Sequence, residues 1–294
     1  MKTSDDVRIR FGLWPGSKGY VLIYPGRTEY IEKYGRVITR LSARGLGCVI
    51  LDWRNQGLSD RAAKTGHVLD YDEYQRDIGA VLDTQIVRDL DARPHLLSHS
   101  MGGLIALGSL RRGVDVKSAI FSAPMWGMGL APPVRAALKL IANTASNLGL
   151  GTGKVLGSKR GSYIKTADPQ GNTLMSDPET VRWIQRQLNT YPHLSLGGPS
   201  WAWLRASHQE IGRLESYGVP DLPTLTVLGS EESVVDAQAI RDRVTLPENG
   251  KLFISDGAKH EVLMETPDIQ DLVWTEMDKI WGVRPDQAFR SSSA

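Results

Sequence analysis

Short apolar runs alternate with longer segments of helical period through the first part of the chain. Runs rich in valine and isoleucine predict buried strands over residues 20–24, 46–53, 94–98 and 116–121. Between these runs, helices are expected over residues 31–45 and 71–90, because apolar side chains such as Tyr34, Val37 and Leu41 recur three and four positions apart. Strands that alternate with helices predict a mostly parallel sheet flanked by helices.

The alternation stops near Pro124 and returns with predicted strands over residues 224–228 and 251–254 and a closing helix over residues 267–281. The intervening sequence holds prolines, glycines and helical pieces but no clear strand. The chain is therefore expected to form an α/β core, residues 1–124 and 208–294, with a helical insertion, residues 125–207, which we call the lid.

Composition and charge exclude several classes of protein. The chain has 41% hydrophobic and 23% charged residues, as globular proteins do, and its formal net charge of +2 gives no basic footprint for nucleic acid. The single cysteine, Cys48, excludes an internal disulfide and lies in an apolar run typical of a core. The first residues lack the apolar stretch of a secretory signal, and no apolar run approaches the ~20 residues of a spanning helix. We expect a soluble, cytoplasmic protein.

Residues 98–103 read SHSMGG and lie where a predicted strand meets a helical segment. This arrangement is typical of a nucleophile elbow, a strained turn in which small residues must stand two before and two after the nucleophile. Ser98 and Gly102 satisfy that requirement around Ser100, although glycine is usual at the first position. Ser100 is therefore the candidate nucleophile.

A serine hydroxyl needs a neighbouring base, and the chain has six histidines. His260 is the candidate base, because it follows the last predicted strand and precedes the closing helix. His95 and His99 flank the elbow and are expected to be structural. The other three histidines lie in polar segments, where we expect them to be exposed to solvent: His67, His193 and His208.

The acid that orients the histidine should fall between Ser100 and His260, after a late strand. Residues 228–236 offer three candidates. Glu232 is preferred because it stands three residues after Gly229, at the position where triads of this type most often have aspartate. Asp236 is expected to cap the next helix, and Glu231 should point away from its neighbour, but both remain alternatives.

Negative charge on the carbonyl oxygen of a tetrahedral intermediate requires preorganised donors, each commonly worth ~100- to 1000-fold in rate. The backbone amide of Met101 is expected to be one donor. The second is expected to be the amide of Arg27, in the loop after the strand at residues 20–24. The helix that begins after Ser100 adds a favourable partial charge.

At these residues the sequence resembles the monoacylglycerol lipase and bacterial lysophospholipase family, within the group that carries the serine aminopeptidase-type hydrolase domain. The resemblance spans residues 19–281, and its signs are the segments 25–34, 52–59, the Ser100 elbow and His260 with Glu261. Residues 196–203, LGGPSWAW, look like the lysophospholipase branch in particular. The resemblance implies an α/β-hydrolase fold with a helical lid and a serine esterase that needs no cofactor or metal.

Two departures from the family pattern stand out. The first motif usually begins His-Gly and continues with glycine, glutamate and histidine, whereas residues 25–30 read PGRTEY, so both histidines are missing. Donation by the amide of Arg27 survives, because an amide needs no particular side chain. Glu232 stands where aspartate is more frequent, and glutamate is an accepted variant of the triad.

The lid is expected to cover Ser100 and govern access. Four of the eight tryptophans, Trp126, Trp183, Trp201 and Trp203, fall within it. With Met125, Met128 and Leu130 they either line an acyl-chain tunnel or form the lid's own small core. Apolar residues also recur at helical spacing at Val134, Leu138, Ile141, Ala145 and Leu148, with Arg135 and Lys139 on other faces of the helix. Such a helix either rests peripherally on an anionic membrane or packs in the ordinary way.

The expected function is hydrolysis of carboxylic esters of single-chain lipids, lysophospholipids or monoacylglycerols, through an acyl-enzyme on Ser100. A peptidase of the iminopeptidase type shares the fold and triad but needs an acidic pocket for a free amine, for which Asp177, Glu179 and Glu210 are the candidates. A non-catalytic binding protein is a further alternative, raised by the altered loop at residues 25–30.

Overall fold

The sheet at the centre of the molecule is seen in a computed structural model that describes residues 1–61, 66–90, 92–158, 161–218, 220–244 and 250–284. Within these ranges seven strands pair in the order β1-β3-β2-β4-β5-β6-β7. β1 is antiparallel to β3, and the other pairs are parallel. The strands are β1 (Phe11–Trp14), β2 (Tyr20–Tyr24), β3 (Gly47–Leu51), β4 (His95–His99), β5 (Ser118–Ser122), β6 (Thr224–Gly229) and β7 (Gly250–Ser255).

The helices of the described chain lie between and beyond these strands. In the core they are α1 (Gly35–Ser42), α2 (Asp72–Leu82), α3 (Gln85–Arg88), α4 (Met101–Arg111), α8 (Ala237–Val244) and α9 (Pro267–Trp281). Single 3-10 turns are η1 (Ile31–Tyr34) and η4 (Val262–Met264). The prediction of a mostly parallel sheet flanked by helices is confirmed, and the closing helix begins and ends at the predicted residues.

Three elements differ from the sequence-based expectation. β1 was not predicted, because this half-buried edge strand is only four residues long and a glycine interrupts its large apolar side chains. The helix expected over residues 31–45 begins as η1 before α1. The helix expected over residues 71–90 is split into α2 and α3 at Thr84, whose hydroxyl donates to the carbonyl of Val81 at 2.7 Å and competes with the helical hydrogen bonds.

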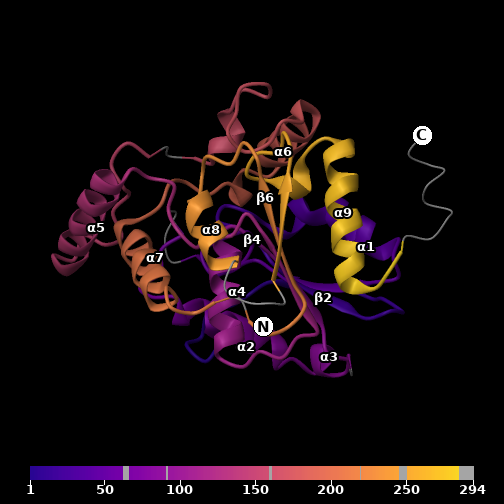
Figure 1. Cartoon of the computed structure of the whole chain (residues 1–294). Helices are drawn as coiled ribbons and strands as arrows, with labels where there is room; N and C mark the ends of the chain where they lie inside the picture. The colour runs from indigo at the N-terminus through magenta and orange to yellow at the C-terminus, as the bar shows by residue number, and fades with distance from the viewer. Residues whose placement is uncertain (62–65, 91, 159–160, 219, 245–249, 285–294) are drawn as a thin grey trace.

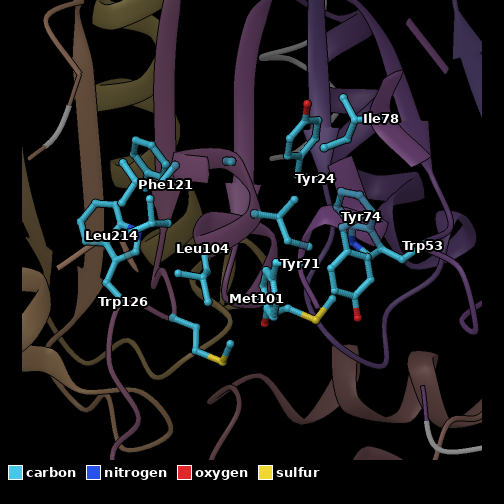
Figure 2. Packing of buried hydrophobic residues seen from close by; sticks show 14 of the residues in the cluster. Tyr24, Trp53, Tyr71, Tyr74, Ile78, Met101, Leu104, Phe121, Trp126 and Leu214 are labelled. Atoms are coloured by element: carbon cyan, nitrogen blue, oxygen red, sulfur yellow. The ribbon is translucent and has the colours of Figure 1, made fainter. Parts of the chain in front are cut away.

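Two apolar cores cover the two faces of the sheet, because successive side chains of a strand point to opposite sides. In β2, Leu22 and Tyr24 belong to one core, which includes residues of α2 and α4. Val21 and Ile23 belong to the other core, which includes residues of α1 and α9. Figure 2 shows part of the first core, with Trp53 and Tyr74 on one side of Met101 and with Phe121 and Trp126 on the other.

The lid carries α5 (Pro132–Asn147), η2 (Tyr163–Thr166), α6 (Pro178–Thr190), η3 (Pro192–Leu194) and the start of α7 (Trp201–Arg213). Its described residues form no strand of the sheet. The expected boundary at residue 207 falls inside α7, which continues to Arg213. α5 packs against α7 and lies at the outer edge of the molecule, away from the sheet (Figure 1).

Candidate active site

Ser100 stands at the turn between β4 and α4, with φ 50° and ψ −117°. These angles lie in a strained region for a residue with a side chain, as expected of a nucleophile elbow. A Cβ at Gly102 would lie 2.1 Å from the carbonyl oxygen of Tyr24, so glycine is required there. Ser98 is accommodated, and its hydroxyl donates to the carbonyl of Ile120 at 3.2 Å.

The structure brings Ser100, His260 and Glu232 into one hydrogen-bonded chain. Nδ1 of His260 lies 2.7 Å from Oε2 of Glu232, and Nε2 lies 2.9 Å from Oγ of Ser100. A carboxylate can only accept, so Nδ1–H donates to Glu232 and the neutral ring leaves Nε2 to accept from the serine hydroxyl. This geometry prepares Ser100 to lose its proton to His260.

Glu232 is held for this contact by its own loop. Its second oxygen, Oε1, accepts from the amides of Val234 at 2.6 Å and Val235 at 3.1 Å. Burial by itself opposes ionisation of this carboxyl, but the hydrogen bond and charge of His260, with the two amides, lower its pKa. Glu232 is therefore an ionised and oriented acceptor.

The two alternative acids are engaged elsewhere. Asp236 accepts from the amides of Gln238 and Ala239, each at 3.1 Å, as the N-terminal cap of α8, and it also pairs with Arg135 at 3.2 Å. Glu231 is exposed. Of the three candidates, Glu232 is the one that contacts His260.

The loop that carries Arg27 leaves the sheet beside the elbow, because β2 and β4 are parallel neighbours with Tyr24 opposite Ser98. Its shape is held without the two histidines of the family pattern. Thr28 has a positive φ of 68° and donates its amide to Oε1 of Gln56 at 2.6 Å. The amide of Gly26 donates to Glu29.

The side chain of Arg27 makes contacts with the lid that the sequence did not predict. Its guanidinium lies 5.0 Å above the ring of Trp203 and donates to the carbonyl of Gly197 at 2.9 Å. The loop expected to supply a backbone donor is therefore joined directly to the lid.

Three of the tryptophans that were expected either to line an acyl-chain tunnel or to form the core of the lid are buried. Trp126, Trp201 and Trp203 are 2%, 8% and 6% exposed. Trp126 packs on Phe121 with ring centroids 5.0 Å apart, and its N–H donates to the carbonyl of Gly103 at 3.3 Å. These contacts place the three rings in the core shared by the lid and the sheet.

The remaining histidines have packing partners or reach solvent. His95 and His99 are buried, and burial lowers the pKa of each to about 4, so both rings are neutral at neutral pH. The ring of His99 lies 4.8 Å from that of His260. His193 is exposed as expected, whereas His67 and His208 are half-buried and contact Ser200 and Leu204.

Among the residues that the structure describes, no helix is long and apolar enough to cross a membrane, and no group of three His, Cys, Asp or Glu side chains could hold a metal ion.

Comparisons with known proteins show which family the chain resembles over most of its length. A family model described as serine aminopeptidase, S33, matches residues 15–267. The probable lysophospholipase L2 of Haemophilus influenzae is 28% identical over 254 residues, which cover 85% of this chain and 79% of that protein. Lysophospholipase L2 of Escherichia coli K12 is 29% identical over 277 residues, 89% of this chain and 80% of that protein.

Solved structures show the same fold. A soluble variant of monoglyceride lipase from Saccharomyces cerevisiae, in complex with a substrate analogue, superposes with a TM-score of 0.75 at 18% identity and covers 94% of this chain and 91% of its own. The monoacylglycerol lipase of Paleococcus ferrophilus gives 0.71 at 18% identity, with 93% and 98% covered. At this identity the likeness concerns the α/β-hydrolase fold alone.

Proposed function

We propose that this chain, a hydrolase that belongs to the serine aminopeptidase S33 family, cleaves the ester bond of single-chain lipids, lysophospholipids or monoacylglycerols, by forming an acyl-enzyme on Ser100. The observation that carries the proposal is the hydrogen-bonded chain from Ser100 through His260 to Glu232. The lipid class is supported by relatives named lysophospholipase, which match over most of their length.

The geometry supports two chemical half-reactions. In the first, Oγ of Ser100 attacks the ester carbonyl while Nε2 of His260 takes its proton, and Glu232 stabilises the imidazolium that forms. His260 then gives the proton to the leaving alcohol oxygen as the C–O bond breaks. In the second, His260 takes a proton from water, the resulting hydroxide attacks the acyl carbon, and Ser100 regains its proton as the fatty acid leaves.

We assign the stabilisation of negative charge on the carbonyl oxygen to two hydrogen-bond donors, the backbone amides of Met101 and Arg27. Met101 is the first residue of α4, whose N-terminus points its partial positive charge toward the elbow. Arg27 lies in the loop after β2, beside the elbow.

Of the three acids that a peptidase of the iminopeptidase type could use, two are engaged by other groups and the third is exposed, which favours ester hydrolysis. Asp177 caps α6 by accepting from the amides of Glu179 and Thr180. Glu210 lies 3.6 Å from Arg112 and 3.4 Å from Arg213. Glu179 has a side chain that is 76% exposed.

The lid surface supports a peripheral contact with the cytoplasmic side of the membrane. Val134 and Ile141, on α5, and Leu148, directly after its last residue, are spaced seven positions apart and are exposed, whereas Leu138 is half-buried against the core. Between residues 130 and 156 of the lid, the exposed large apolar residues are Leu130, Val134, Leu140, Ile141, Leu148, Leu150 and Leu156. A bilayer that holds the substrate would bury such a surface. Co-sedimentation with liposomes tests this contact.

Fatty-acid release from lysophosphatidylcholine and from monoacylglycerol with the same acyl chain tests the reaction. We expect release by the wild type and a loss of at least ~10⁴-fold in kcat for Ser100→Ala, because the nucleophile is removed. Preference for the phospholipid assigns a lysophospholipase, and preference for the glyceride assigns a monoacylglycerol lipase. No release from either substrate by folded wild-type protein overturns the lipid proposal.

A further inference from the structure

A cluster of charged side chains is buried beside the triad and takes no part in the reaction described above. Lys33, in η1, lies between two carboxylates, those of Glu29 and Glu261. Its Nζ is 2.6 Å from Oε1 of Glu29 and also contacts Oε2 of Glu261. The three side chains are 6%, 5% and 7% exposed. One ammonium group thus joins two segments of chain that meet at the active site.

On one side, Lys33 reaches the loop that carries Arg27. The second oxygen of Glu29 accepts from the amide of Gly26 and from the hydroxyl of Tyr34, the latter at 2.6 Å. A Cβ at Gly26 would lie 2.9 Å from this oxygen, so the carboxylate is in close contact with the loop backbone. The position of Glu29 therefore fixes the backbone just before the amide of Arg27.

On the other side, Lys33 reaches the loop of the base. Glu261 follows His260 directly in the chain, and its amide donates to the carbonyl of Leu174 at 2.7 Å. The side chain of Glu261 points to Lys33, so the ammonium group fixes the backbone on the C-terminal side of the histidine.

The cluster is shielded from water. A cavity of about 10 Å³, room for one water molecule at most, is lined by Glu29, Tyr34, His99, Glu261, Leu263 and Met264. Burial disfavours the charged form of Lys33, yet attraction to Glu261 and Glu29 raises its pKa above the ordinary value. Burial also raises the pKa of Glu261, whereas Lys33 and its neighbours overcome burial and lower that of Glu29 to about 2.

The stability of the fold does not by itself explain such a cluster. Apolar residues of similar volume commonly replace a buried ion group without loss, because removing charges from water is expensive. What the charges add is a defined geometry, since each hydrogen bond is short and directional. Here that geometry sets the separation of the loop of Arg27 from the loop of His260.

We propose that Lys33 is a positioning residue that holds the oxyanion loop and the His260 loop at a fixed separation, and that it thereby sets the rate of the chemical steps rather than the binding of substrate. This role rests on the proposed function, because it takes Ser100 as nucleophile and Arg27 as donor. A displacement of about 1 Å at a reacting group is enough to lower a rate ~100-fold.

The test compares Lys33→Met with Lys33→Arg, which retains the charge. We expect Lys33→Met to lower kcat by ~10- to 100-fold with KM within about twofold, and Lys33→Arg to restore most of the loss. The rate at which a fluorophosphonate probe labels Ser100 should fall in parallel. Because labelling needs no lipid, it tests the role of Lys33 even if the wild type releases no fatty acid, an outcome that overturns the proposed function alone.

The matched control is Arg44→Met, which removes another buried ion pair, with Asp278, on α9. It should lower the free energy of unfolding while kcat and the labelling rate stay unchanged. If Lys33→Met does not fold, Glu261→Gln serves instead, since it keeps the size of the side chain and should also lower the labelling rate. Three results would each overturn the proposal. The first is a wild-type kcat and labelling rate in Lys33→Met or Glu261→Gln. The others are equal losses of kcat and labelling rate in Arg44→Met, and failure of Lys33→Arg to restore the rate.

Discussion

Two helices of nearly equal length relate to the rest of the molecule in opposite ways. α9 has 15 residues and buries five of them, Gln270, Val273, Trp274, Met277 and Trp281. α5 has 16 residues and buries only Ala142. α9 packs against β5, β6 and β7, whereas α5 packs against α7 in the lid (Figure 1).

The difference shows that a helical stripe of apolar residues does not by itself say what covers it. α9 gains its stability from the sheet, as most helices of globular proteins gain theirs from tertiary packing. Ile141 of α5 and Leu148, directly after its last residue, stay exposed at 46% and 70% although α5 packs against α7. One helix therefore serves folding, and the other leaves apolar side chains exposed, which we propose contact a lipid phase.

The largest effect is expected from removing a core side chain of α9. Trp274 is 1% exposed and lies under the guanidinium of Arg44, 4.5 Å from the ring centroid. Trp274→Ala should lower the free energy of unfolding by about 3–5 kcal/mol, because it leaves a cavity in the core. Ile141→Ser on α5 should change it by no more than ~0.5 kcal/mol. Urea unfolding measures both, and equal losses would remove the distinction between the helices.

The double variant Ile141→Ser, Leu148→Ser sharpens the comparison at the level of function. We expect its hydrolysis of a soluble short-chain ester to stay at the wild-type rate, since neither residue is part of the triad. Hydrolysis of lipid in vesicles, and co-sedimentation with them, should fall ~10-fold or more, because each buried aliphatic side chain contributes roughly 1.5–3 kcal/mol.

The control for this variant is Leu272→Ser, which removes an exposed leucine, 62% accessible, from α9. It should leave vesicle binding unchanged. A loss of vesicle binding as large as that of the double variant would show that exposed apolar side chains anywhere on the surface act alike, and the lid would lose its special role.

The triad could be located from the sequence because its residues carry local signals. The small residues around Ser100 mark the elbow, and His260 and Glu232 follow late strands at sites typical of this fold. The contacts of Lys33 could not be found in this way. Its partner Glu261 lies 228 positions away in the chain, and nothing in the local sequence indicates that the two side chains meet in the interior.

The limits on the fold prediction have similar physical causes. Central strands such as β3 are buried throughout and read as apolar runs, whereas β1 is a half-buried edge strand of four residues that a glycine interrupts. The tryptophan-rich segment at residues 200–203 left a tunnel and a lid core equally open. The structure shows Trp203 beneath the guanidinium of Arg27, a contact between residues 176 positions apart.

The smallest effect concerns pH and the end of α9. His95 lies 6.2 Å from the ring of Trp281, and burial lowers its pKa to about 4. A histidine with a depressed pKa stabilises the fold fully above the unfolded value of ~6.5, and the contribution is lost as the pH falls toward 4, because the unfolded chain binds the proton first. His95→Asn should therefore unfold more easily than wild type at pH 7, and the gap should narrow as the pH falls from 6.5 to 4. Because water still screens the ring in part, we expect the gap to change by less than ~1 kcal/mol, which urea unfolding across this pH range can measure. A constant gap would mean that the neutral ring acts only through its packing against Trp281 and its hydrogen bond with Ser118, as uncharged contacts such as those of α5 with α7 do.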